Sequence, residues 1–177
     1  AVGLGERPHH RVRLPGQHEG RRIHGPVSQI DIVPTLLDLL GEPAPDNLQG
    51  KSLRPLLEST ASSDRADSDV VIEWNGPNNG LGDVKNDVSI PEWMRKTVSS
   101  DDIRAAMVDP VRTIIAADGW KLNWSAREEH ELYNLTADPH EIRNVFAAEP
   151  SVAKTLARRI RAWQQETGDT VTLPSVH

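Results

Sequence analysis

Residues of the kind that surround a phosphate occur at Gly50-Lys51-Ser52. A phosphate-binding loop ends in this triplet, because its backbone amides and its lysine contact the phosphates. The loop also needs a glycine five positions before Gly50, where this chain has Pro45, and no strand-like run leads into the segment. We therefore predict that Ser52 caps a short helix that ends near Leu57.

Two carboxylates, Asp31 and Asp38, are spaced so that one helix face would present both, as a paired acid and base or a metal site requires. Leucines flank Asp38, and no basic residue or histidine is in register with the pair. Capping and solubilising roles are the better interpretation.

Residues 1–26 are rich in arginine and histidine, which can bind nucleic acid or metal. The histidines form no helical i, i+4 pair and have no carboxylate in register, which argues against a metal site. No aromatic residue is interleaved with the arginines to stack on bases, and the chain has a net charge of −6, so we expect no nucleic-acid partner. We predict an irregular, partly solvated lead-in.

The composition bounds the remaining possibilities. The absence of cysteine excludes disulfides, thiolate catalysis and cysteine-ligated zinc. Apolar residues make up 37% of the chain, and 13 prolines and 12 glycines indicate a small core framed by loops. No apolar run approaches the roughly 20 residues of a membrane span and no secretory signal is present, so no membrane partner is expected. The location stays open, with the cytoplasm as the expectation for the chain as written.

Residues 27–40 form the clearest helix of the sequence. Asp31 is its expected N-cap, Pro34 falls in the first turn, where a missing N–H is tolerated, and Gly41 suits the left-handed position after the last turn. Apolar residues recur at three- and four-residue steps and make one stripe: Ile30, Val33, Leu36, Leu37 and Leu40.

Strands are predicted at 70–74, a β-branched run, and at 111–125, a hairpin. Asp118-Gly119 is the pair that a type I′ hairpin turn prefers, because both residues must accept a positive φ. Three large side chains of the return strand would share one face that needs a cover: Trp120, Leu122 and Trp124. Two short amphipathic segments are expected within 84–108, the second capped by Ser100.

Residues 131–135 predict a further strand, and Asp138-Pro139-His140-Glu141 has the pattern of a capping box. In that motif Asp138 is the N-cap, Pro139 is the first helical residue and Glu141 reaches back to the N-cap amide.

A last helix is expected over 150–167, with Gly168 after it. Its apolar stripe would cover the tryptophan face of the hairpin. Arg158, Arg159 and Arg161 could form an anion-binding patch, although a solvated face is the better interpretation. Residues 170–177 are expected to be a trailing tail.

Together these elements predict an α+β fold, in which a small antiparallel sheet of about four strands is covered by a C-terminal helix. We expect a boundary in the linker-like segment after residue 60. Residues 1–60 would form the lead-in and a helical unit, and residues 61–177 the small α+β domain.

Long motifs in the chain resemble those of the formylglycine-dependent sulfatases of the alkaline phosphatase superfamily. ELYNLTADPHEIRNV at 131–145, VSQIDIVPTLLDLLG at 27–41 and LQGKSLRPLL at 48–57 carry the resemblance, which we expect to begin near Val12 and to extend to residue 168. The positions that match are Asp31, Pro34, Gly41, Gly50, Tyr133, Asp138, Pro139, Glu141 and Asn144. Because each of these residues has a structural use as a cap, strand or turn, we interpret them as scaffold.

The resemblance implies that 1–60 end in a remnant of the large α/β sulfatase domain, and that the catalytic portion precedes this chain. Residues before Val12 would come from a misassigned start, a frameshift or a decayed gene. Formylglycine forms from Cys or Ser in a C/S-x-P-x-R motif, and the nearest pattern here, Ser89-Ile90-Pro91-Glu92-Trp93, ends in Trp. The motifs for a divalent cation such as calcium are also absent from the sequence. We therefore expect no catalytic residue, metal ligand or cofactor in this chain.

The resemblance also implies that the loop after 70–74 faces the active-site cleft. Trp74, Asn75 and Asn78 are then candidates for substrate contact: the indole would stack on a sugar or aryl face, and the amides would bind hydroxyl groups of a sulfated small molecule or sugar. The alternative is that this loop is only a turn.

Three functions remain open at this point. The chain is the C-terminal part of a sulfatase, a non-catalytic module for binding or oligomerisation, or the tail of a related phosphoester or phosphonate hydrolase.

Overall fold

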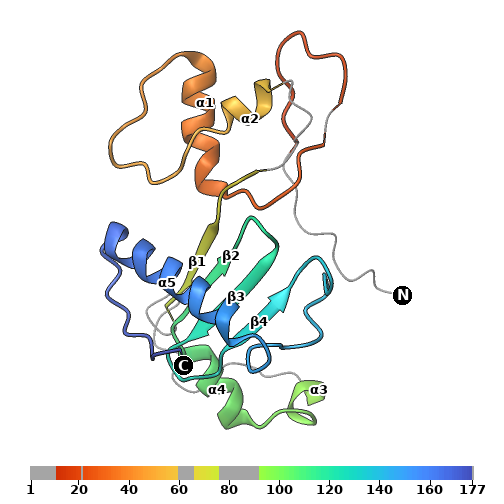
Figure 1. Cartoon of the computed structure of the whole chain (residues 1–177), viewed down its shortest axis with the longest axis vertical. Coiled ribbons are helices and arrows are strands. Elements are labelled where there is room, and N and C mark those ends of the chain that lie inside the picture. Colours follow the sequence, from red (N-terminus) through yellow and green to blue (C-terminus); the bar gives the residue numbers. More distant parts are fainter. Residues whose placement is uncertain (1–10, 21, 60–65, 76–91, 177) are drawn as a thin grey trace.

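The computed structural model describes residues 11–20, 22–59, 66–75 and 92–176. Its elements follow the chain as η1 (Gln29–Asp31), α1 (Ile32–Leu40), α2 (Arg54–Glu58), β1 (Val70–Trp74), α3 (Glu92–Arg95), α4 (Ser100–Val108), β2 (Val111–Ile115), β3 (Trp120–Ser125), β4 (Glu131–Asn134) and α5 (Pro150–Thr167). The helical unit with α1 and α2 lies beyond one end of the sheet, and α3 and α4 lie beyond the other (Figure 1). The expected boundary at 60/61 falls outside the described residues.

The four strands form one antiparallel sheet in the order β1-β2-β3-β4. Val71 pairs with Ile114, Ile114 with Leu122, and Leu122 with Leu132, so this row of apolar side chains crosses the whole sheet. The expected α+β architecture is confirmed.

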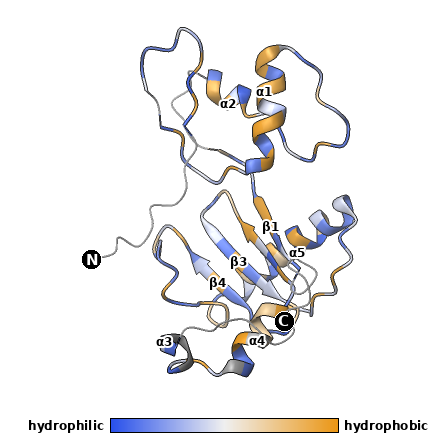
Figure 2. Ribbon diagram, turned by 180° about the vertical axis from the view of Figure 1, so that it is seen from behind, coloured by the Kyte–Doolittle hydropathy of each residue, from blue (hydrophilic) through white to orange (hydrophobic). Residues whose placement is uncertain are grey.

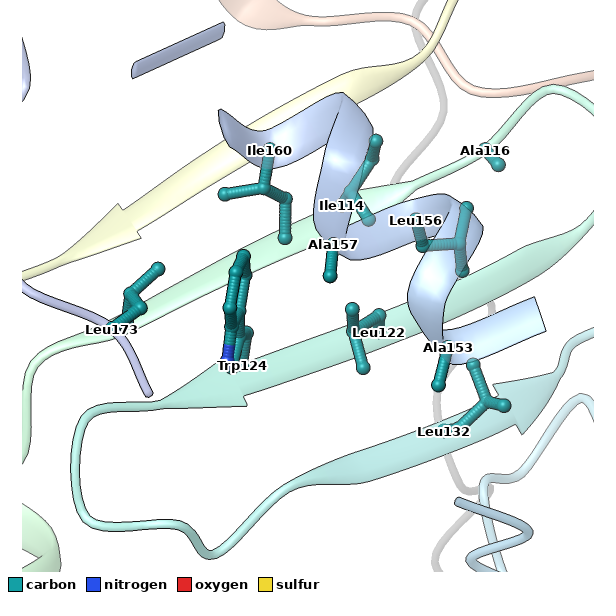
Figure 3. Close-up of a cluster of buried hydrophobic side chains, with 10 residues drawn as sticks. All are labelled: Ile114, Ala116, Leu122, Trp124, Leu132, Ala153, Leu156, Ala157, Ile160 and Leu173. Carbon is teal, nitrogen blue, oxygen red and sulfur yellow. The ribbon is translucent and has the colours of Figure 1, made fainter. Parts of the chain in front are cut away.

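Helix α5 covers the apolar face of the sheet, as predicted (Figure 3). Ala153, Leu156, Ala157 and Ile160 come from the helix, and Gly168 ends it at φ 72°. Sheet residues complete the core: Ile114, Ala116, Leu122, Trp124 and Leu132. At roughly 25 cal/mol per Å² of buried apolar area, this layer is the main source of stability of the small domain.

The expected tail at 170–177 is wrong for most of its length, because it packs on the core. Leu173 is only 3% exposed, and Val171 and Val176 pack beside it. Arg161 of α5 donates to the Leu173 carbonyl at 2.6 Å, and Gln164 donates to the Val171 carbonyl at 2.9 Å. These bonds, which α5 supplies, hold the segment in place.

The hairpin between β2 and β3 has a three-residue loop in place of the expected type I′ turn. Gly119 is the residue with positive φ (93°), whereas Asp118 is not among the described residues with positive φ. Gly119 N–H donates to Ala116 O, and Ala116 N–H donates to Trp120 O. This is a type I turn followed by a left-handed glycine, in which only one residue needs a positive φ.

The expected capping box at Asp138–Glu141 is also wrong, because no helix follows it. Glu141 has a positive φ of 57°, which a helix excludes, and its carboxylate pairs with Lys121 at 2.6 Å. The Asp138 carboxylate accepts the Arg143 amide at 2.8 Å instead of capping a helix. The contact with β3 decides the conformation of this segment.

Smaller differences concern helix caps. Ser99, not Ser100, caps α4 by accepting the Asp102 amide at 3.0 Å. Leu53, not Ser52, is at the N-cap position of α2, although Ser52 Oγ accepts the Arg54 amide at 3.1 Å. None of the described helices combines the length and the apolar character that crossing a membrane requires.

Candidate functional site

The carboxyl end of β1 presents the predicted contact residues. Trp74 ends the strand and is 41% exposed, and Asn75 follows it half-buried. Asn78 lies outside the described residues, so the structure brings together two of the three candidates. An exposed indole at the end of a strand is suited to stacking on a flat ligand face.

A buried arginine supports this end of the sheet. Arg112 on β2 is 1% exposed, and its Nη1 donates to the Trp74 carbonyl at 3.1 Å. Its Nη2 and Nε contact both carboxylate oxygens of Asp169 at 2.7 and 2.9 Å. This two-pronged arrangement fixes the guanidinium plane and, through it, the backbone position of Trp74.

Asp169 is held as an anion from several sides. Arg112 lowers its pKa most, against the effect of burial, and the amide of Gln164 adds to the lowering. Gln164 on α5 donates to Asp169 at 2.7 Å and is itself 6% exposed. The pair therefore links β2, the end of α5 and the C-terminal segment.

Sequence patterns did not identify Arg112 or Asp169 as important. The available signal was the alternation in β2, which places Arg112 on the same buried face as Ile114. A charged side chain in such a position needs a partner. The partner, 57 residues later in the chain, follows Gly168.

The 131–145 motif forms a backbone clamp on the edge strand β4. The side-chain oxygen of Asn144 accepts the amides of Leu132 and Phe146, each at 3.0 Å, and its nitrogen donates to the His130 carbonyl at 3.0 Å. Tyr133 on the same strand is 7% exposed, and its burial raises the pKa of its hydroxyl. One side chain thus satisfies three backbone groups of the sheet edge.

In the turn at Asp138, too, a side chain accepts hydrogen bonds from backbone amides. The amides of Arg143 and Ile142 lower the pKa of Asp138 by stabilising its carboxylate. Pro139 lies in the turn that follows.

The polar face of α1 holds the Gly-Lys-Ser segment. Asp31 is at the N-cap position of α1 but does not cap it, because its two carboxylate oxygens accept the amides of Ser28 and Lys51 at 3.2 and 2.9 Å. Asp38 accepts the Ser52 hydroxyl at 2.5 Å, which lowers its pKa. The two carboxylates are therefore engaged by protein groups.

Gly50 is required by a close approach. A Cβ at this position would overlap the carbonyl group of Ile30, the middle residue of η1. Pro34 is buried in the first turn of α1, and Gly41 ends that helix at φ 75°, both as expected.

The apolar face of α1 is exposed. Ile32, Val33, Leu36 and Leu40 have exposed fractions of 39%, 50%, 52% and 74%. Helical spacing places them opposite Asp31 and Asp38. Figure 2 shows that α1 is largely hydrophobic and lies apart from the sheet.

A divalent cation in a protein is held by several oxygen or nitrogen donors that lie close together. Among the described residues, no group of three or more histidine, aspartate or glutamate side chains is placed to hold a metal ion.

One protein-family model matches the N-terminal part of the chain. The family model described as "N-sulphoglucosamine sulphohydrolase, C-terminal" matches residues 7–78. The match begins before Val12, where the motif resemblance was expected to start.

Similar sequences and structures cover most of the chain. Human arylsulfatase K is 26% identical over 84% of this chain and 24% of its own length, and bovine N-acetylglucosamine-6-sulfatase is 28% identical over 93% and 30%. A protein solved in complex with its substrate D-glucosamine-2-N,6-O-disulfate has a TM-score of 0.52 at 22% identity, covering 79% of this chain and 24% of that one. A putative sulfatase from Bacteroides thetaiotaomicron has a TM-score of 0.50 at 25% identity, with 82% and 26% covered. The chain thus spans about a quarter to a third of the length of these relatives.

Proposed function

Because the chain is a C-terminal sulfatase portion of the alkaline phosphatase superfamily, we propose that the complete protein hydrolyses the sulfate ester of a sugar. This chain then supplies scaffold and substrate contacts, and a catalytic N-terminal portion supplies the nucleophile and the metal ligands. The sequence of this chain has no C/S-x-P-x-R motif from which formylglycine could form.

The exposed apolar face of α1 is the observation that supports docking of this chain on a catalytic portion. A nine-residue helix with Leu36 and Leu40 more than half exposed leaves apolar area in water, at a cost of roughly 25 cal/mol per Å². Contiguous apolar area of this kind marks an interaction surface. Docking of the catalytic portion on this face removes it from water.

The polar face of α1 makes the docking surface rigid. Thr35 is 5% exposed, donates to the Asp31 carbonyl and accepts the Leu53 amide at 2.8 Å. Arg54 of α2 donates to the Asp38 carbonyl at 2.7 Å. These bonds fix α1 to α2 and to the residue before it. Docking on the apolar face then costs little further conformational entropy of α1.

A sulfated amino sugar is the substrate class that we favour. The family model is named for an N-sulphoglucosamine sulphohydrolase and the bovine relative for an N-acetylglucosamine-6-sulfatase, and the ligand in one solved structure is a glucosamine disulfate. Trp74, half-exposed and anchored by Arg112, is suited to stack on the sugar ring. Asn75 and Asn78 are proposed to bind its hydroxyl groups.

The test is release of inorganic sulfate from N-acetylglucosamine 6-sulfate. It compares this chain alone with a longer protein that joins it to the sequence encoded upstream of residue 1. We expect the longer protein to release sulfate and this chain to release none. Turnover by this chain, or an upstream sequence without sulfatase-like coding, contradicts the proposal.

A Trp74→Ala variant of the longer protein tests the substrate contact. Loss of stacking is expected to raise KM roughly tenfold, because one aromatic contact contributes on the order of 1 kcal/mol or slightly more. Trp93→Ala, which removes another exposed indole (68%), is the matched control. An equal effect of both changes rules out a specific role for Trp74.

A further inference from the structure

A cavity of about 650 Å³ lies between α5 and the C-terminal segment. Its lining includes three cationic side chains of α5, Lys154, Arg158 and Arg161, and no acidic residue. The chain as a whole has a net charge of −6, so this grouping runs against the average charge of the protein. Its local potential favours an anion.

These cations have no carboxylate partner within the described part of the chain. Arg158 donates to the Thr155 hydroxyl at 3.3 Å. Arg161 donates to the Leu173 carbonyl at 2.6 Å, and its guanidinium lies 4.8 Å from the ring centre of Trp124. By contrast, the neighbouring Arg159 points to Asp69 and forms an ion pair at 3.2 Å. The charges of the three cavity residues are thus not neutralised by a protein anion.

Trp124 belongs to the same lining and carries a buried donor without an acceptor. Trp124 is 2% exposed, and its indole Nε1 has no hydrogen-bond partner among the described residues. The ring lies beneath α5, between Leu173 and Leu122 (Figure 3). Buried indole N–H groups usually have an acceptor. Ser151 and Ser175 add hydroxyl groups to the lining.

We propose that this cavity binds a sulfate or phosphate group carried by a small ligand. The lining offers cations and N–H and O–H donors, which is the chemistry that recognises an oxyanion. The C-terminal segment closes one side through Ser175 and Val176, so its packing on α5 creates the site. The proposal stands on these residues and does not depend on the proposed sulfatase function.

The experiment titrates the 177-residue chain at low ionic strength with three sugars. N-acetylglucosamine 6-sulfate and N-acetylglucosamine 6-phosphate carry the oxyanion, and unmodified N-acetylglucosamine does not. Calorimetry gives the affinity, and the indole N–H resonance of Trp124 in ¹⁵N-labelled protein gives the place of binding. We expect the charged sugars to bind and to shift this resonance, and the neutral sugar to do neither.

Variants separate a specific site from a general charge effect. Arg158→Gln and Lys154→Gln are each expected to weaken binding roughly threefold to tenfold, as loss of a partly exposed charge contact implies. Arg127→Gln removes the same charge from the exposed turn after β3 and should leave the affinity unchanged. Melting curves confirm that the variants, which change exposed side chains, remain folded.

The outcomes decide the proposal and the ligand. Binding of only one charged sugar supports the site and identifies sulfate or phosphate as its group, and binding of both supports a general oxyanion site. Absence of binding, equal binding of the neutral sugar, or an equal loss in Arg127→Gln overturns it.

Discussion

Arg112 and Asp169 form an ion pair that is removed from solvent, since their side chains are 1% and 9% exposed. Ion pairs on the surface contribute little to stability, but removing one partner of a buried pair leaves the other charge poorly compensated. The pair therefore matters for stability mainly because loss of either residue would leave the other charge buried. Their geometry also fixes the carbonyl of Trp74 at the candidate site.

Asp169→Asn is expected to lower the free energy of unfolding by about 3 kcal/mol at pH 7, because buried Arg112 then keeps only the half-exposed carboxylate of Glu73, at 3.9 Å, as a counter-charge. Denaturant unfolding measures the change. Asp46→Asn, in the exposed loop after α1, is the control. Adding Arg112→Met to Asp169→Asn should cost less than the sum of the two single changes, and additive losses contradict the coupling.

The pair also predicts a pH dependence with a definite sign. Arg112 lowers the pKa of Asp169 in the folded state, below the value of about 3.9 in an unfolded chain. The stabilisation is then complete above that value and is lost as pH falls through the lower folded-state pKa. The stability difference between the native chain and Asp169→Asn should therefore shrink below about pH 4. A difference that stays constant to pH 2 rules this out.

Gly50→Ala is expected to destabilise the α1 unit by about 1–3 kcal/mol, because the new Cβ overlaps the Ile30 carbonyl group. Hydrogen exchange of the α1 amides measures this unit separately from the sheet. At Gly20, where an added Cβ meets nothing within 4 Å, alanine is the matched control. Equal protection in both variants shows that the close approach is not needed.

At the scale of elements, local patterns predict what local forces decide. The strands, α5 and the glycine after α1 follow from periodicity and from the need for a left-handed residue, which neighbouring residues determine. The Asp138–Glu141 segment has the same quality of local pattern, yet Lys121, 20 residues earlier, pairs with Glu141 and the segment turns. Sequence patterns could not give that contact, because it exists only after the strands have paired.

The candidate site also contains one residue that local patterns predict and others that meet only in the folded chain. Trp74 was predictable as a residue at a strand end followed by turn formers. Its anchor was not, because Arg112 and Asp169 meet only when α5 lies across the sheet. The cavity beside α5 likewise needs the C-terminal segment in place, and composition alone indicates a tail there.

Leu173→Ala tests whether the C-terminal segment is part of the core. Leu173 is 3% exposed against Trp124 and its neighbours, so a loss of about 2–4 kcal/mol in unfolding free energy is expected. Thr172→Ala, at an exposed neighbouring position, should change stability by less than about 0.5 kcal/mol. Similar urea midpoints for the two variants contradict the packing described for this segment.

The whole molecule contains one buried apolar layer and one exposed apolar helix face. The layer between the sheet and α5 accounts for folding of the small domain. The apolar face of α1 is instead exposed, and polar bonds on the other side of the helix keep it in position. This difference allows the two roles to be separated by mutation.

Leu36→Ser with Leu40→Ser is expected to leave the melting temperature of this chain nearly unchanged, because both side chains are already more than half exposed. In the longer protein that includes the upstream portion, the same change should lower the unfolding free energy by several kcal/mol, since two leucines lose a buried contact. Ile142→Ser, 83% exposed on the small domain, is the control and should have no effect in either protein. If the double change affects both proteins equally, α1 does not dock the catalytic portion, and its exposed face needs another explanation.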